Sequence, residues 1–207
     1  ADFANDSIQV IVCARSLNRE ERDALKGAKI QFDEYRVALS AVAVIANKSN
    51  ALRQLRVSQL DSIFSGDCTQ WPGGRKKGVI DLVIGGVNSS TNEVFRTTIL
   101  KGKKFAMSAT PTDSSAQLVE HVEKSPSAIG IVGLNWLGGK ESDVTAMALG
   151  TPGERPDSTE PYGEYYTPAQ AYLFKEYYPL TTSVYIYSRA ASADIALGFI
   201  SFVSSAQ

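Results

Sequence analysis

A short run of hydroxyl side chains, Ser89-Ser90-Thr91, is the part of this sequence best suited to bind an anion. Residues 79–84 before it have the apolar pattern of a strand, and helical spacing follows over residues 94–99. The hydroxyls would therefore stand at a helix start, where backbone N–H groups and the helix dipole attract negative charge. Such a turn binds phosphate or sulfate. The alternative is that these hydroxyls only cap their own helix.

Composition limits the classes of partner that the chain can have. Its 207 residues are 43% hydrophobic, enough for a core in one large or two small domains. Lys and Arg total 21 against 22 Asp and Glu, so no overall positive field favours nucleic acid, and an anion site must be local. The longest apolar run, residues 37–46, is too short to span a bilayer, and residues 1–6 do not resemble a secretion signal.

The cysteines and the single histidine do not form a catalytic or metal-binding pattern. Cys13 is expected in a buried strand and Cys68 in a loop, and neither has a second Cys or a His at ligand spacing. Their spacing leaves disulfide pairing open. His121 is expected on an amphipathic helix in a surface role, away from any Ser-His-Asp or Cys-His pairing. We therefore expect no metal, no cofactor and no enzyme activity.

Apolar β-rich runs alternate with helical patterns along the chain. The strands are expected at residues 7–13, 36–47, 79–84, 128–134 and 178–187. Helices are expected after Asn18, over residues 58–64, after Ser89, and over residues 113–123 and 193–201, with Gly66 ending the second. This alternation indicates an α/β fold with largely parallel sheets covered by helices. The lysines of residues 101–104 are interpreted as solvated surface.

Several segments together resemble the PstS-like family, the periplasmic substrate-binding proteins of phosphate ABC transporters. They are Ala14-Arg-Ser-Leu-Asn, Val42-Ala-Val-Ile-Ala-Asn47, Leu60-Asp-Ser-Ile-Phe-Ser-Gly66 with Trp71, Ser89-Ser-Thr91, Ser127-Ala-Ile-Gly-Ile-Val132 and Tyr178-Pro-Leu-Thr. The resemblance implies a two-lobed, type II periplasmic-binding-protein fold with phosphate between its α/β lobes. It assigns residues 1–37 and 177–207 to a discontinuous first lobe and residues 38–176 to the second.

The chain departs from the family in its charged groups. The family's commonest cradle is Ser-Gly-Thr, with an arginine four residues before it; here Ser90 replaces the glycine and Gly85 the arginine. The acidic residue that commonly accepts the phosphate proton corresponds to Ala14, next to Arg15. We predict that Arg15 replaces the missing arginine. The alternative is an ion pair between Arg15 and Glu20 or Glu21.

The resemblance implies a predicted ligand-binding set of Ser89, Ser90, Thr91, Asn88, Ala14 and Arg15. The family also has an opening segment before the first strand seen here. Without it, the first lobe is expected to be incomplete and to expose an apolar edge, which favours self-association or a second chain that completes the lobe.

The function implied by the resemblance is non-catalytic binding of an oxyanion, with inorganic phosphate first, for delivery to an ABC transporter permease. The protein would then act in the periplasm or another extracytoplasmic space. A different possibility is a degenerate binding fold that serves as an interaction or sensing module without phosphate. A phosphoryl-transfer enzyme is the third possibility, but the sequence lacks a Lys-bearing phosphate loop and a tight Asp/His cluster.

Overall fold

The chain divides into two compact units, which are described separately. The computed structural model describes residue 3 and residues 8–72, 78–86, 89–137, 144–150, 164–189 and 195–205. Unit 1 comprises Ala1–Ser40 with Thr182–Gln207, and unit 2 comprises Ala41–Thr181. One boundary falls inside strand β2 (Phe32–Asn47), and the other falls at the first residue of strand β9 (Thr181–Arg189). Both passages between the units are therefore made along continuous strands.

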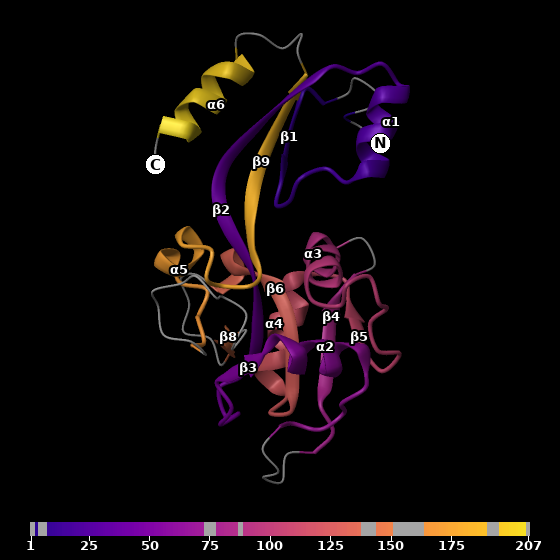
Figure 1. Ribbon diagram of the computed structural model, residues 1–207, viewed down its shortest axis with the longest axis vertical. Helices are drawn as coiled ribbons and strands as arrows, with labels where there is room; N and C mark the ends of the chain where they lie inside the picture. The colour runs from indigo at the N-terminus through magenta and orange to yellow at the C-terminus, as the bar shows by residue number, and fades with distance from the viewer. Residues whose placement is uncertain are drawn as a thin grey trace. The chain divides into compact units, whose positions relative to one another are not determined.

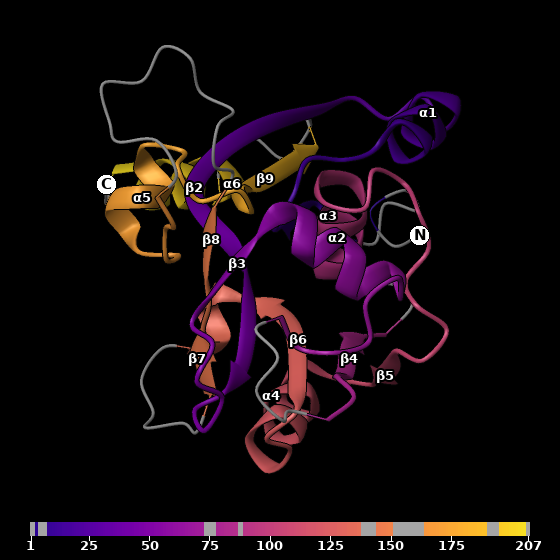
Figure 2. The same ribbon diagram turned by 60° about the horizontal axis from the view of Figure 1, so that its bottom comes forward.

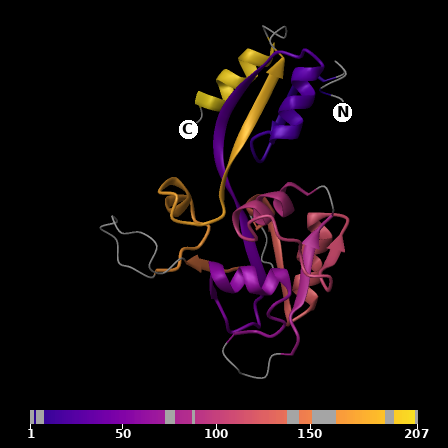
Figure 3. The same ribbon diagram turned by 45° about the vertical axis from the view of Figure 1, so that its right-hand side comes forward.

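Unit 1 is a small sheet with one helix on each face. Strand β1 (Val10–Cys13) pairs antiparallel with β9, and the sheet order is β1-β9-β2. Helices α1 (Arg19–Gly27) and α6 (Ile195–Ser205) lie on opposite sides of the strands (Figures 1 and 3). Successive side chains of β9 point to opposite faces of the sheet, as in any pleated strand. The α1 side buries Leu17, Leu25 and Tyr187, and the α6 side buries Val37, Ile186 and Ile200.

The start of α1 is set by its capping residues, as the sequence predicts. The Glu21 backbone N–H donates to Asn18 Oδ1 at 2.8 Å, and the Asn18 backbone N–H donates to Glu21 Oε2 at 2.9 Å. This reciprocal capping box satisfies two N–H groups that have no partner within the helix. The helix ends at Gly27.

The sheet of unit 2 is mixed, so the expectation of a largely parallel sheet is wrong. Strand β4 (Asp81–Gly85) lies parallel to β6 (Ala128–Gly133) and to β5 (Thr110–Thr112), whereas β2 is antiparallel to β6. Strand β7 (Val144–Ala146) pairs antiparallel with the end of β2. Strands buried on both faces have the same apolar composition in either direction, so their pattern does not reveal the direction of pairing.

Both faces of this sheet are covered by helices (Figure 2). Helix α4 (Ser115–Lys124) covers one face, and helices α2 (Val57–Ser65) and α3 (Ser90–Thr98) cover the other. Alternate β2 residues pack on the two sides. Ala43 and Ile45 pack with Leu118 and Val122 of α4, whereas Val42 and Val44 pack with Leu60, Phe64 and Phe95. The predicted helix stop at Gly66 is confirmed, because Gly66 is the C-cap of α2 with φ of 92°.

Shorter elements complete unit 2. Strands β3 (Gln54–Arg56) and β8 (Ala148–Gly150) form a separate parallel pair. A 3-10 turn, η1 (Leu134–Leu137), follows β6, and helix α5 (Gln170–Phe174) precedes the return to unit 1. Within the part of the chain that the structure describes, no helix is long and apolar enough to cross a membrane.

Candidate functional site

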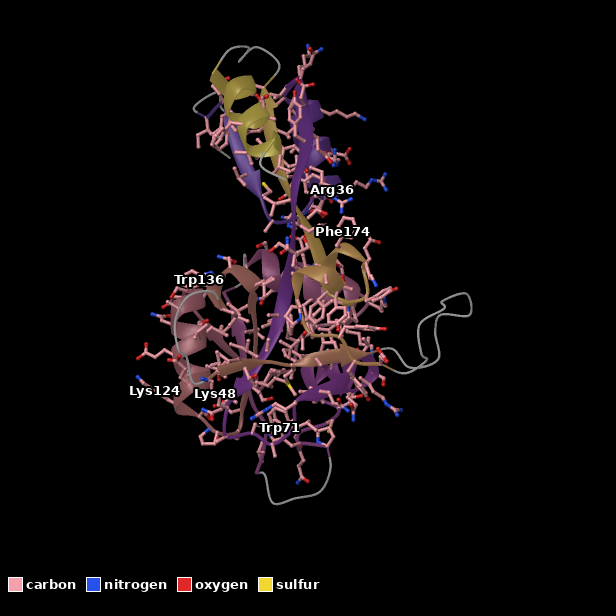
Figure 4. All side chains as sticks on the ribbon, turned by 90° about the vertical axis from the view of Figure 1, so that its left-hand side faces the viewer. Arg36, Lys48, Trp71, Lys124, Trp136 and Phe174 are labelled. Carbon is pink, nitrogen blue, oxygen red and sulfur yellow. The ribbon has the colours of Figure 1, made fainter. Side chains whose placement is uncertain are left out.

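The carboxyl ends of the parallel strands β4, β5 and β6 define one edge of the unit 2 sheet. Gly85 of β4 pairs with Thr112 of β5, and Gly133 of β6 pairs with Val42, near the point where β2 enters the unit. Ligands of open α/β sheets bind at such an edge. Figure 4 labels the exposed Trp136, which follows β6 at this edge. The predicted hydroxyl run follows β4 at the same edge.

The hydroxyls at the start of α3 are not used to cap the helix. Ser89 is the N-cap residue, with extended backbone angles, but its side chain makes no capping hydrogen bond. The Ser89 hydroxyl contacts the Thr91 hydroxyl instead. Residues 89–91 are half-buried. The helix start therefore offers N–H groups and hydroxyls to an anion in one place.

Ser90 is accommodated where the family has glycine. It is the first residue of α3. Among the described residues, positive φ occurs outside glycine only at Lys29, Lys101 and Glu176, so Ser90 has an ordinary negative φ. A Cβ is allowed in that region of the backbone map. The backbone at Ser90 therefore accommodates a side chain without strain.

Asn92 is a polar residue of the site that the sequence pattern does not predict. It is 8% exposed, and its Nδ2 donates to the carbonyls of Gly85 at 2.7 Å and Gly86 at 3.1 Å. These bonds fix the start of α3 to the end of β4. Asn92 is the third helical residue, where side chains often reach back to the helix start. That position was the only available sequence signal, because the burial of Asn92 depends on the packed sheet.

Gly85 lacks a side chain for a steric reason. A Cβ built on Gly85 would lie 2.8 Å from Ser89 Oγ and 2.9 Å from Ser89 Cβ. Any side chain there, including the family's arginine, requires Ser89 to move. A side chain at residue 85 and Ser89 in its present position therefore exclude each other.

Arg15 forms an ion pair with Glu21, the alternative role expected from the sequence. Its Nη1 and Nη2 donate to the two carboxylate oxygens of Glu21 at 2.8 and 2.9 Å, and Nη1 also donates to the Ser16 carbonyl at 2.9 Å. This bidentate pair lowers the pKa of Glu21. Arg15 lies in unit 1, whereas the hydroxyl run lies in unit 2. No anion contact of Arg15 is needed to explain its conformation.

The structure shows no ligand-binding group at the other two members of the predicted set, Ala14 and Asn88, within the residues it describes. Ala14 is exposed, and its carbonyl accepts a hydrogen bond from Thr182 Oγ1 at 2.7 Å. Its methyl side chain has no polar group for a ligand. Asn88 lies outside the described residues. The structure therefore brings together Ser89, Ser90 and Thr91, adds Asn92, and places Arg15 and Ala14 in the other unit.

The cysteines and the histidine form no metal centre within the described residues. Both thiols are free, and burial raises the pKa of the Cys13 thiol, which is only partly buried against the core of unit 1. His121 Nε2 lies 2.7 Å from Asp81 Oδ2, at the start of β4 and so away from its carboxyl end. No group of three or more His, Cys, Asp or Glu side chains in the described ranges could hold a metal ion.

Two curated relatives align with nearly the whole chain. Protein SphX of Synechococcus elongatus is 25% identical over 210 residues, which cover 97% of this chain and 60% of that protein. The phosphate-binding protein PstS of Staphylococcus saprophyticus is 25% identical over 211 residues, covering 98% of this chain and 59% of that protein. The chain thus spans about three-fifths of the length of these relatives.

Solved structures share the fold at lower identity. A Clostridium perfringens protein crystallised with bound phosphate has a TM-score of 0.77 at 19% identity, covering 98% of this chain and 75% of that one. An ABC-type phosphate transport receptor from Vibrio cholerae has a TM-score of 0.69 at 20% identity, covering 98% and 76%. These likenesses confirm the α/β periplasmic-binding-protein fold that the sequence predicts, of which this chain covers a part.

A family model provides the remaining comparison. The model described as the PBP superfamily domain matches residues 1–207, the full extent of the chain. The match agrees with the sequence resemblance, the relatives and the fold. The chain therefore belongs to the PBP superfamily domain family.

Proposed function

We propose that this chain binds a tetrahedral oxyanion, inorganic phosphate first, at the start of α3. The observation that carries the proposal is that Ser89, the N-cap residue, makes no capping bond and lies beside Thr91 at a helix N-terminus. One of the relatives is named as a phosphate-binding protein, which supports binding without catalysis. Delivery of the anion to an ABC transporter permease, outside the cytoplasmic membrane, is the role that fits this family.

The energetics of such a site are adequate. Micromolar binding requires about 8 kcal/mol. Hydrogen bonds to a charged ligand contribute about 1.5–3 kcal/mol each, and a helix terminus adds up to about 2 kcal/mol. The two hydroxyls, the backbone N–H groups of the first turn and the helix dipole can therefore supply most of the free energy. Binding the anion breaks no covalent bond.

A second candidate is a binding fold that serves as an interaction or sensing module without phosphate. It is favoured by two facts: Gly85 supplies no cation, and the Arg15 guanidinium is bonded to Glu21. Direct binding measurements separate the two candidates, because the module would bind no oxyanion.

The proposal is tested by titration calorimetry with phosphate, sulfate, arsenate and molybdate. Wild type should bind at least one of these anions. Ser89→Ala and Thr91→Val should each weaken that binding about tenfold or more, since each removes a hydrogen bond to a charged ligand. Thr97→Val is the matched control, because its hydroxyl bonds to the Glu93 and Val94 carbonyls toward the other end of α3. Absence of binding by wild type would support the module instead.

A further inference from the structure

Asn92 presents a buried amide oxygen that has no hydrogen-bond partner among the described residues. The residue is 8% exposed, and Oδ1 is fully shielded from solvent. A buried carbonyl oxygen left without a donor costs free energy, so native proteins almost always pair such atoms. This atom lies at the start of α3, where the candidate anion site is located. A ligand with a donor group would complete its hydrogen bonding.

The orientation of the amide is determined by its partners. Nδ2 donates to the carbonyls of Gly85 and Gly86 at 2.7 and 3.1 Å. Rotating the amide by 180° would place Oδ1 against those two carbonyl oxygens, which are acceptors only. The free atom of Asn92 is therefore the acceptor, and a donor is what it lacks.

This acceptor borders the same small space as the Ser89 hydroxyl. The point where a Gly85 Cβ would stand is 3.5 Å from Asn92 Oδ1 and 2.8 Å from Ser89 Oγ. No side chain separates the two atoms from that point, because residue 85 is glycine. Since Oδ1 is shielded from solvent, a ligand reaches it only after the atoms that cover it move.

We propose that Asn92 Oδ1 accepts the proton of a protonated tetrahedral oxyanion and so makes the site select monohydrogen phosphate or arsenate over sulfate. The inference rests on the proposed function, since it assigns ligand selectivity to the same site. Monohydrogen phosphate carries one O–H donor, whereas sulfate carries none at neutral pH. A site with a buried acceptor discriminates against an analogue that cannot donate, because the acceptor is then left unpaired. A neutral amide oxygen accepts this proton without repelling the anion, as a carboxylate would.

The test compares anions with and without a proton, using the 207-residue chain at neutral pH. Titration calorimetry is run with phosphate, arsenate, sulfate and monofluorophosphate, the last being a phosphate analogue with fluorine in place of the hydroxyl. Wild type should bind phosphate and arsenate at least tenfold more tightly than the other two. Asn92→Ala should reduce that preference at least tenfold, because only phosphate and arsenate lose an acceptor for their proton.

Asn47→Ala is the matched control. Asn47 is 6% exposed, and its Nδ2 also donates to two backbone carbonyls, those of Val122 and Glu123. Its Oδ1, however, is paired with Ser49, and it lies at the end of β2, toward the edge where Lys48 and Lys124 are labelled in Figure 4. Asn47→Ala should leave the preference for phosphate unchanged.

The outcomes are distinguishable. If Asn92→Ala weakens phosphate and sulfate by the same factor, Asn92 has only a structural role and the inference is overturned. Wild type that binds all four anions equally would also overturn it, while leaving the proposed function intact. This second result needs no variant, so it applies even where Asn92→Ala fails to fold. Wild type that binds none of the four anions overturns both proposals.

Discussion

Gly85 controls how closely Ser89 can approach the end of β4. Since a Cβ there would lie under 3.0 Å from both side-chain atoms of Ser89, Gly85→Ala must displace that residue. We expect oxyanion affinity to fall about tenfold and the free energy of unfolding to fall by about 1–3 kcal/mol, the usual cost of overpacking. Calorimetry and denaturant unfolding measure the two effects. Gly78→Ala is the control, because a Cβ at Gly78 would meet nothing within 4 Å.

Arg15 remains a predicted second ligand for the anion, and Glu21 competes with the anion for its guanidinium. If Arg15 binds the oxyanion, its guanidinium must exchange Glu21 for the ligand. Arg15→Ala should then nearly abolish binding, and Arg15→Lys should weaken it, because lysine lacks the bidentate fork. The measurement is titration calorimetry with phosphate.

Glu21→Gln provides the complementary variant for Arg15. It removes the competing carboxylate and leaves the arginine in place, so phosphate affinity should be retained or increased. Equal affinities in wild type and Arg15→Ala would show that Arg15 serves only its ion pair. Such a pair, at 21% and 38% side-chain exposure, contributes about 0–1 kcal/mol to stability.

At the scale of the element, the first turn of α1 should respond to acid. Glu21 accepts hydrogen bonds from Arg15 and from the Asn18 backbone, and the Arg15 bond is the main cause of its lowered pKa. Because the pKa is lower in the folded state, the stabilisation is fully present above the unfolded pKa, near 4.5. It is lost as pH falls through the lower folded-state pKa.

The pH effect is measured by denaturant unfolding of wild type and Glu21→Gln. At pH 7 wild type should be more stable by about 1 kcal/mol or less, the range for an ion pair at the protein surface. The difference should disappear well below pH 4.5. A difference that is the same at both pH values would mean that the Glu21 charge does not stabilise α1.

At the scale of the whole molecule, unit 1 has exposed apolar surface that favours association. Among the described residues, β1 pairs with β9 alone and so forms an edge of the sheet. Val12 on β1 is 60% exposed, and Phe199 and Phe202 on α6 are 49% and 73% exposed. Exposed strand edges and apolar patches promote pairing with another chain.

We therefore expect light scattering to show self-association that depends on protein concentration. Val12→Lys should shift the population toward monomer, because charge on an edge strand opposes pairing. The same substitution should leave oxyanion binding unchanged, since Ser89 and Thr91 lie in unit 2. A monodisperse wild-type monomer at every concentration would count against this prediction.

The features that could be predicted from the sequence depend on interactions between near neighbours in the chain. The start of α1 after Asn18, the stop of α2 at Gly66 and the position of Ser89 before α3 are all correctly predicted. Capping, the left-handed glycine and hydrophobic periodicity act within a few residues. For the same reason, the hydroxyl run could be assigned to a helix start before any tertiary structure was known.

Only the tertiary structure decided the features that depend on distant segments. The antiparallel direction of β2 follows from its pairing with β6, more than 80 residues away in the chain, and no local pattern specifies it. Arg15 could pair with Glu20, Glu21 or a ligand, and the fold of the turn before α1 places Glu21 within reach. Asn92 is an ordinary polar residue on a helix until packing against β4 buries it and leaves Oδ1 without a donor. Burial and pairing are set by which segments meet, and a short stretch of sequence does not contain that information.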